Sequence, residues 1–450
     1  MSWRRALYSV LLYIVSPLVP LYLLWRARRQ PEYARGWGER FAWRYGCSKR
    51  STATRRVWLH AVSLGETRAA KPLIDALFAC DEVVHVTLTH TTPTGRAAGQ
   101  ELFASYLASG RMTQVYVPYD LPDVVARFLR RFAPTDCWLM ETEIWPNTIA
   151  ACVKRGISVS LLNGRLSDKT LQKTLKNGFF AKLFKQAYGQ LSNVCAQSVA
   201  DGDRYEQLGV SQARLTLTGN LKFDMSTPHE QVVAGLRWRA SLSDARRIVL
   251  LASTREGEEQ LWVDALHSKA FDGVFDDVQW WLVPRHPQRF SEVENLLRES
   301  GFAHEALVRK TMLDSLAETR LGESLSQVKV VLGDTMGEMF AYYAAADVVL
   351  MGGAWQPLGG QNFLEPLSIG KPTIIGPHTY NFVQAAQDAV AASALIQVTD
   401  ISDALHEAQR LLAQDDERER YGANAQAFVV QHQGAVARTL NRVLCQPNTR

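Results

Sequence analysis

Short apolar runs alternate with amphipathic stretches along most of the chain. In the first half the runs are rich in β-branched and aromatic residues, which is typical of buried strands. The stretches between them repeat apolar residues at helical spacing, as in 68–78 and 122–132. The expected strands of this half lie at 57–61, 83–89, 114–119, 137–140, 159–162, 194–197 and 215–218. Strands joined by helical crossovers predict a parallel, doubly wound sheet.

A second series of the same kind follows a polar, helical stretch at 226–247, which we interpret as a linker. Its expected strands lie at 248–252, 278–283, 328–332, 348–351, 373–375 and 395–398. Two or three helices then run to the end of the chain. The pattern predicts an α/β protein with two Rossmann-like domains, at 31–225 and 248–450, facing each other across a cleft, and we allow for the terminal helices to cross back.

The N-terminal segment 1–30 contains an uncharged run of twenty residues between Arg5 and Arg26. Twenty helical residues reach about 30 Å, the thickness of the hydrocarbon core of a bilayer. Pro17 and Pro20 are expected to kink the helix. The run passes directly into arginines without a small-residue cleavage site, so we expect a retained membrane anchor rather than a signal peptide. A spanning helix and an interfacial helix both fit this sequence.

The charges are distributed unevenly along the chain, which the small net charge does not reveal. The 450 residues carry a net charge of +5, and 47% of them are hydrophobic, as in a folded globular protein. Residues 1–56 carry +10 and the remainder −5. The cations that follow the apolar run place the body on the cytoplasmic side of the membrane and attract anionic lipids. An acidic body excludes a nucleic-acid-binding protein.

The loops that follow the strands are the expected place for chemistry, because ligands of open α/β sheets bind beyond the carboxyl ends of the strands. The first loop ends in Glu66, near the start of a helix at Thr67. One interpretation is a carboxylate at the positive end of its own helix, worth about 0.3–1 kcal/mol. The other interpretation is a general base.

A second acidic loop follows the fourth strand and contains Glu141 and Glu143. We expect at least one of them to cap the helix that begins at Pro146. The other interpretation is a buried carboxylate beside a basic group. Lys222, in the loop after the seventh strand, is the candidate partner, since a cation at this edge of the sheet suits a carboxylate or a phosphate.

The second half of the chain shows four further strand-end loops. Ser253 or Thr254, followed by glutamates, predicts a helix start at the first loop. Two prolines fix a rigid loop at 284–287 that presents Arg285, a donor matched to phosphate. Glycines at 333–337 and 352–360 precede helices and favour a phosphate cradle.

Several classes of site are absent or weak in the sequence. Neither a dinucleotide-binding glycine motif nor a P-loop is present, which argues against oxidoreductases and NTPases. Asp201 and Asp203 resemble the acidic pair of metal-dependent glycosyltransferases, but the surrounding pattern favours a helix start, so we predict no metal site. Glu365, one turn into the helix that follows the glycines at 352–360, is instead suited to accept hydrogen bonds from the two hydroxyls of a ribose.

These loops together resemble one family, the 3-deoxy-D-manno-octulosonic acid (Kdo) transferases. The matching segments, in collinear order over most of the chain, are RGWGERF, HAVSLGE, TPTG, YDLP, METEIWPN, NGRLS, GNLKFD, STREGEE, LVPRHPQRF, GDTMGEM, GGQNFLEP and GPHTYNF. The resemblance implies the GT-B fold, CMP-Kdo as donor, the tetraacyl lipid A precursor (lipid IVA) as acceptor, and inverting transfer without a metal or other cofactor.

The resemblance also implies residue roles. Glu66 would be the base, while Glu141 and Lys222 would stabilise the transition state. The residues implied for CMP are Pro284, Arg285, Met336, Gly337, Glu338, Asn362, Phe363, Leu364 and Glu365. One departure is Gln361, where the family usually has His. Two alternatives stay open: another GT-B enzyme, such as a UDP-sugar epimerase or a lipid-linked N-acetylglucosaminyl transferase, and a non-catalytic lipid- or nucleotide-binding protein.

Overall fold

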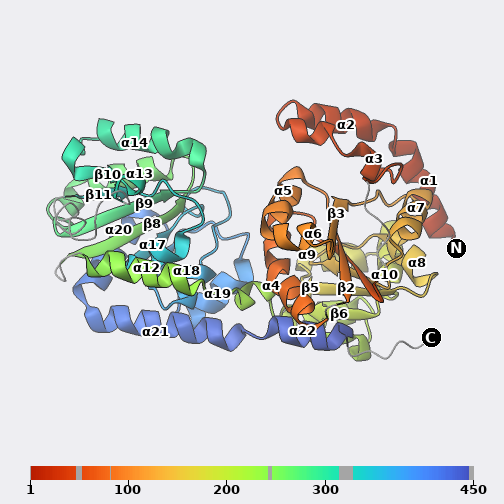
Figure 1. Ribbon diagram of the computed structural model, residues 1–450. Helices are drawn as coiled ribbons and strands as arrows, with labels where there is room; N and C mark the ends of the chain where they lie inside the picture. The colour runs from red at the N-terminus through yellow and green to blue at the C-terminus, as the bar shows by residue number, and fades with distance from the viewer. Residues whose placement is uncertain (1, 47–52, 82, 242–245, 314–327, 445–450) are drawn as a thin grey trace. The chain divides into compact units, whose positions relative to one another are not determined.

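The computed structural model describes residues 2–46, 53–81, 83–241, 246–313 and 328–444. The chain divides into two compact units: unit 1, Met1–Asp224 with Gln433–Arg450, and unit 2, Met225–His432. Each unit is built on a seven-stranded sheet in which every pairing is parallel (Figure 1). The predicted α/β fold with parallel, doubly wound sheets is therefore confirmed.

The sheet of unit 1 has the strand order β3-β2-β1-β4-β5-β6-β7, so the order reverses between β1 and β4. The strands are β1 (Arg55–His60), β2 (Val84–His90), β3 (Met112–Tyr116), β4 (Asp136–Met140), β5 (Ser158–Gly164), β6 (Asn193–Ala196) and β7 (Leu215–Leu217). Neighbouring residues of β1 enter different cores, Trp58 on one face and Leu59 on the other, because side chains alternate along a strand.

Helices cover both faces of this sheet. They are α1 (Trp3–Val15), α2 (Leu18–Ala27), α3 (Trp37–Arg40), α4 (Leu64–Cys80), α5 (Pro93–Leu102), α6 (Ala104–Ala108), α7 (Pro122–Phe132), α8 (Pro146–Val153), α9 (Asp168–Leu175), α10 (Phe179–Tyr188), α11 (Val199–Gln207) and α22 (Ala435–Leu444), with 3-10 turns η1 (Pro31–Ala34), η2 (Gln212–Arg214) and η3 (Leu221–Asp224). The last helix, α22, joins unit 1 because Asp224 accepts the backbone N–H groups of Gly434 and Val436.

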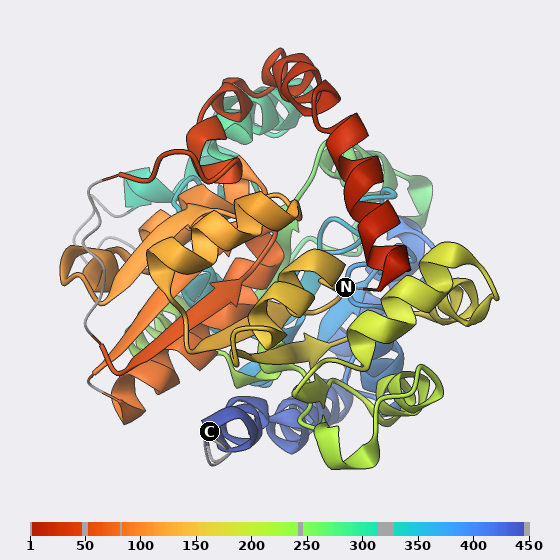
Figure 2. The same ribbon diagram turned by 90° about the vertical axis from the view of Figure 1, so that its right-hand side faces the viewer.

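The N-terminal run forms α1 and α2, which are bent by 53° at the break before Leu18. Within the described residues, only this bent pair has the length and apolar content of a membrane span, and no single helix does. One face of α1 lies on unit 1, beside α8 and α10 (Figure 2). There the Tyr8 hydroxyl donates a hydrogen bond to Asp120, at 3.1 Å.

The sheet of unit 2 has the order β10-β11-β9-β8-β12-β13-β14, with its reversal between β8 and β12. Its strands are β8 (Arg247–Thr254), β9 (Val278–Pro284), β10 (Leu307–Arg309), β11 (Val330–Leu332), β12 (Val348–Met351), β13 (Thr373–Ile375) and β14 (Ile396–Gln397). The prediction of six strands is wrong by one, because β10 is a three-residue edge strand without a recognisable apolar run.

The helices of unit 2 include the segment that we expected to be a linker. They are α12 (His229–Ala240), α13 (Glu258–Leu266), α14 (Phe290–Glu299), α15 (Lys310–Leu313), α17 (Met339–Ala345), α18 (Leu364–Ser368), α19 (Val383–Ala391), α20 (Ile401–Ala413) and α21 (Asp415–His432), with 3-10 turns η4 (Lys269–Phe271), η5 (Pro287–Arg289) and η6 (His304–Ala306). Helix α12 packs closely on α17, since a Cβ at Gly235 would lie 2.1 Å from the Ala341 carbonyl oxygen.

Candidate active site

The loops that follow β1 and β4 meet where the strand order of unit 1 reverses. His60, the last residue of β1, pairs in register with Leu139 of β4, so Glu141 comes two residues beyond this pair. Glu66 lies in the first turn of α4, directly after β1. In doubly wound sheets such a reversal is the usual ligand site.

The Glu66 carboxylate accepts a hydrogen bond at the start of its own helix, and its pKa is raised. Its Oε2 accepts the backbone N–H of Val62 at 2.8 Å, and the Ser63 hydroxyl caps the helix at the Glu66 N–H. Burial raises the pKa of Glu66 to about 8, against the hydrogen bond from Val62 and with the help of the nearby Glu141 and Glu143 charges. A carboxyl with this pKa is suited to take a proton near neutral pH.

Glu141 stands on a strained backbone and faces a lysine. Its φ of 53° lies in the left-handed region, which costs a non-glycine residue about 1–3 kcal/mol. Lys222 Nζ lies 3.9 Å from Glu141 Oε1, with both side chains mostly buried. Asn220 and Asn163 position this lysine, because their side-chain oxygens accept the N–H groups of Lys222 and Leu221, each at 3.0 Å.

Glu143 occupies a different place from the one that the sequence suggested. Its Oε2 accepts the Trp145 indole N–H at 2.8 Å and lies 3.7 Å from Nε2 of the buried His60. The helix α8 has no side-chain cap at its N-cap position. The expectation that Glu141 or Glu143 caps this helix is therefore wrong.

Asp120, from the loop after β3, supplies the missing acceptor instead. It accepts the N–H groups of Asn147 and Thr148, at 3.0 and 2.6 Å. Burial raises the pKa of Asp120 to about 6, although these hydrogen bonds oppose the shift. The sequence signal for this residue is YDLP, which marks a turn but not the helix that the aspartate reaches.

At the reversal in unit 2, two glutamates have structural partners. Helix α13 begins at Glu258, with Gly257 as its N-cap, so the predicted cap at Ser253 or Thr254 is wrong and both residues belong to β8. The Glu258 carboxylate accepts four backbone N–H groups at 2.7–3.4 Å, from Arg255, Gly353, Trp355 and Gln356.

Glu259 forms a buried, bidentate ion pair. Each of its carboxylate oxygens lies 2.8 Å from a guanidinium nitrogen of Arg289, and the Thr254 hydroxyl donates to it at 2.6 Å. We did not predict this pair. The two residues are 30 positions apart and come together only because their loops follow the neighbouring strands β8 and β9.

The residues expected to bind CMP fall into two groups. The side chains of Pro284, Phe363 and Leu364 are buried, so only their main-chain atoms are positioned to reach a ligand. The more accessible residues are Arg285, Met336, Gly337, Glu338, Asn362 and Glu365.

Glu365 and its neighbours form a small polar cluster. Its carboxylate accepts the Asn362 amide at 3.0 Å and the Tyr343 hydroxyl at 3.4 Å. Asn362 Oδ1 and Glu338 Oε2 are buried without a hydrogen-bond partner among the described residues. Two such acceptors suit a ligand that brings N–H or O–H donors.

The described residues of the two units contain no clear metal centre. Among the residues that the structure describes, no three His, Cys, Asp or Glu side chains are grouped to hold a metal ion. Asp201 lies in the first turn of α11 and accepts the Leu166 N–H at 2.9 Å, so the predicted helix start is confirmed.

Comparison with known proteins gives consistent matches. The family model described as 3-deoxy-D-manno-octulosonic-acid transferase (kdotransferase) matches residues 35–225. The chain is 40% identical to the 3-deoxy-D-manno-octulosonic acid transferase of Bordetella pertussis, over 97% of this chain and 98% of that protein. It is 31% identical to the protein of the same name from Haemophilus influenzae, over 97% of each. The UDP-GlcNAc 2-epimerase of Neisseria meningitidis bound to UDP-GlcNAc shares the fold, with a TM-score of 0.52, 14% identity, and coverage of 87% and 100% of the two chains.

Proposed function

The chain belongs to the family of 3-deoxy-D-manno-octulosonic acid (Kdo) transferases, and we propose that it moves Kdo from CMP-Kdo to the tetraacyl lipid A precursor, with inversion and without a catalytic metal. The observation that carries this proposal is Glu66. Its carboxyl, with a pKa of about 8, lies where the strand order of unit 1 reverses, and Glu141 and Lys222 stand nearby.

In the proposed reaction Glu66 removes the proton from the acceptor hydroxyl while the hydroxyl oxygen bonds to the anomeric carbon of Kdo. The bond from this carbon to the CMP phosphate oxygen breaks, and CMP leaves with the electron pair. A single displacement inverts the anomeric centre. Lys222 attracts the carboxylate of the sugar, and Glu141 keeps the lysine in place through its ion pair.

Unit 2 is the proposed site for the CMP part of the donor. Arg285 is a guanidinium matched to the phosphate. The unpartnered oxygens of Asn362 and Glu338 accept hydrogen bonds from the nucleotide, and Glu365 accepts from the ribose hydroxyls. The N–H groups around 336–338 and 362–365 complete the donor site.

The N-terminal helices are the proposed attachment to the cytoplasmic side of the inner membrane. Support comes from the charge of +10 in residues 1–56 and from the exposed apolar side chains of α1 and α2. The partners are then CMP-Kdo, the lipid A precursor and anionic lipids, and not nucleic acid.

Mass spectrometry of the reaction products tests the proposal. The full-length protein with CMP-Kdo and the lipid A precursor should increase the acceptor mass by one or more Kdo residues and release CMP. Competition by CMP and by UDP tests the donor independently. An unchanged acceptor would contradict the activity, and binding of UDP without binding of CMP would contradict the donor.

A further inference from the structure

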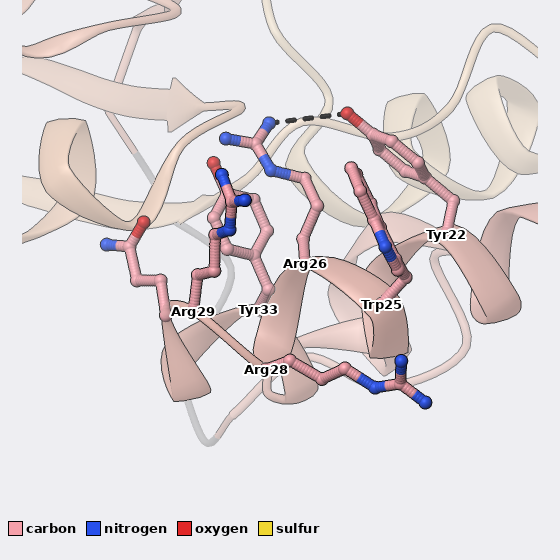
Figure 3. Close-up of a pocket in the computed structure, with 7 residues that line it drawn as sticks. Tyr22, Trp25, Arg26, Arg28, Arg29 and Tyr33 are labelled. Atoms are coloured by element: carbon pink, nitrogen blue, oxygen red, sulfur yellow. Dashed lines mark hydrogen bonds between the residues drawn. The ribbon is translucent and has the colours of Figure 1, made fainter.

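A pocket at the end of α2 combines arginines with aromatic rings (Figure 3). It encloses about 360 Å³ between α2 and η1. Its lining residues are Tyr22, Trp25, Arg26, Arg28, Arg29, Gln30 and Tyr33. None of these residues belongs to the candidate active site described above.

Two of the three arginines of the pocket extend to the same side. The Arg26 guanidinium lies 4.3 Å from the centroid of the Tyr33 ring and donates a hydrogen bond to the Tyr22 hydroxyl at 3.3 Å. Arg26 and Arg29 extend to the same side, whereas Arg28 points away from both (Figure 3). Two guanidinium groups are thus presented together.

The arginines of this pocket have no acidic partner among the described residues. Arg26, Arg28 and Arg29 form no ion pair with an acidic side chain in the part of the chain that the structure describes. Neighbouring cations repel each other, so an anion between Arg26 and Arg29 is favourable. Guanidinium groups match the oxygens of a phosphate and bind it in a bidentate way.

The surroundings of the pocket indicate where the anion comes from. On α2, Leu21 is 63% exposed and Trp25 is 60% exposed, and the neighbouring Leu18 and Leu24 are also exposed. An apolar helix surface that ends in arginines and aromatic rings is typical of the boundary between acyl chains and head groups. A lipid phosphate is the anion that such a boundary offers.

We propose that the pocket binds the phosphate group of a membrane lipid, with Arg26 and Arg29 on the phosphate oxygens and the apolar side chains of α2 among the acyl chains. The inference rests on the proposed membrane attachment and deepens it. Diffuse attraction depends on surface charge alone, whereas this pocket distinguishes one head group from another. A phosphomonoester, with three free oxygens, fits the two guanidinium groups best.

Vesicle binding by the full-length protein tests the pocket. Phosphatidylcholine vesicles contain either phosphatidic acid or phosphatidylserine, adjusted to equal surface charge. We expect the wild type to prefer phosphatidic acid by roughly tenfold, since tenfold corresponds to about 1.4 kcal/mol, the scale of a charge-assisted hydrogen bond. R26Q and R29Q should abolish the preference, and R26K should lose most of it because an ammonium lacks the planar fork.

R28Q is the matched control, because it removes the same charge from a residue that lines the pocket but whose guanidinium points away from those of Arg26 and Arg29 (Figure 3). It should weaken binding to both vesicles and keep the preference. An equal loss of preference in R28Q, or no preference in the wild type, would contradict the proposed binding of a phosphate by Arg26 and Arg29. Abolition of the preference by millimolar inorganic phosphate would overturn the assignment to a lipid. Vesicle binding needs no Kdo transfer, so these results are separate from a failure of the proposed function.

Discussion

The two units place carboxylates at the same point of their sheets but in opposite environments. In unit 1 the reversal between β1 and β4 brings Glu66, Glu141 and Glu143 into one region, and their mutual charge and burial raise the pKa of Glu66 to about 8. In unit 2, at the reversal between β8 and β12, the carboxylate of Glu258 accepts four backbone N–H groups.

The glutamates after β1 and after β8 look alike in the sequence. Their surroundings in the structure show which of them are suited to proton transfer and which have a structural role. In both sequences a glycine followed by a glutamate comes after the strand, at the start of the next helix. In unit 2 each glutamate has its own hydrogen-bond donors. Burial raises the pKa of Glu258 against its backbone hydrogen bonds, through which Glu258 holds the glycine-rich loop after β12, and Glu259 holds Arg289. In unit 1 the acids face each other and have few donors. A poorly compensated carboxyl is the one that is ready to exchange a proton.

The largest expected effect comes from replacing the poorly compensated acid. Glu66→Gln should lower kcat by about 10²–10⁴-fold, the usual contribution of a general base. Turnover is measured by CMP release with purified protein. Gln keeps an oxygen for the Val62 N–H, so the helix start should survive. Near-wild-type turnover would remove Glu66 from the role of base.

The same variant should gain stability in alkaline solution. The carboxyl of Glu66 ionises near pH 4.5 when unfolded and at about 8 when folded. The unfolded state therefore releases its proton first, and the wild type loses stability as the pH rises from about 4.5 to 8. Gln lacks this loss, so the Tm difference between variant and wild type should grow over that range. A constant difference would contradict the raised pKa.

The next effect tests the compensated acids of unit 2. Glu259→Gln leaves Arg289 buried beside a neutral amide and should lower the free energy of unfolding by about 3–5 kcal/mol. Chemical denaturation measures it. Glu292 is the matched control, because it lies 3.4 Å from the same guanidinium but is 66% exposed. Glu292→Gln should cost less than about 1 kcal/mol. Similar losses in both variants would show that burial does not distinguish the two pairs.

Glu258→Gln should have a smaller effect on stability, of about 1–3 kcal/mol, because one amide oxygen still accepts some of the four N–H groups. The amide nitrogen then faces backbone donors and loosens the loop after β12. Since this loop precedes the proposed donor residues, KM for CMP-Kdo should rise more than kcat falls. Glu256→Gln, an exposed control that pairs with Arg255, should leave KM unchanged.

The general arrangement was predictable because it follows from local pattern. Apolar runs separated by amphipathic stretches predict parallel strands, and the loops after parallel strands meet at one edge, which places Glu66 and Glu141 near each other. The edge strand β10 was not predictable, since three residues carry too little pattern.

The side-chain contacts of the site residues could not be predicted from the sequence. Asp120 caps a helix that begins 26 positions later, and His60 lies 3.7 Å from Glu143, more than 80 positions away. Both contacts depend on the order of the strands in the sheet. Spacing along the chain favoured the local cap at Glu141 or Glu143, and the sheet order decided against it.

The smallest effect concerns Glu143, a neighbour that raises the pKa of the base. Glu143→Gln removes a negative charge near Glu66, keeps an acceptor for the Trp145 indole, and should lower the pKa of Glu66. Activity requires ionised Glu66, so the limb of kcat/KM that rises with pH near 8 should move to lower pH, by less than about one unit for a partly screened charge. The measurement is the pH profile of CMP release, with Glu101→Gln, an exposed carboxylate on α5, as the control that leaves the limb in place. A limb that stays or moves to higher pH would mean that the crowding of acids in unit 1 does not tune the base, and the contrast with unit 2 would then be one of hydrogen bonding alone.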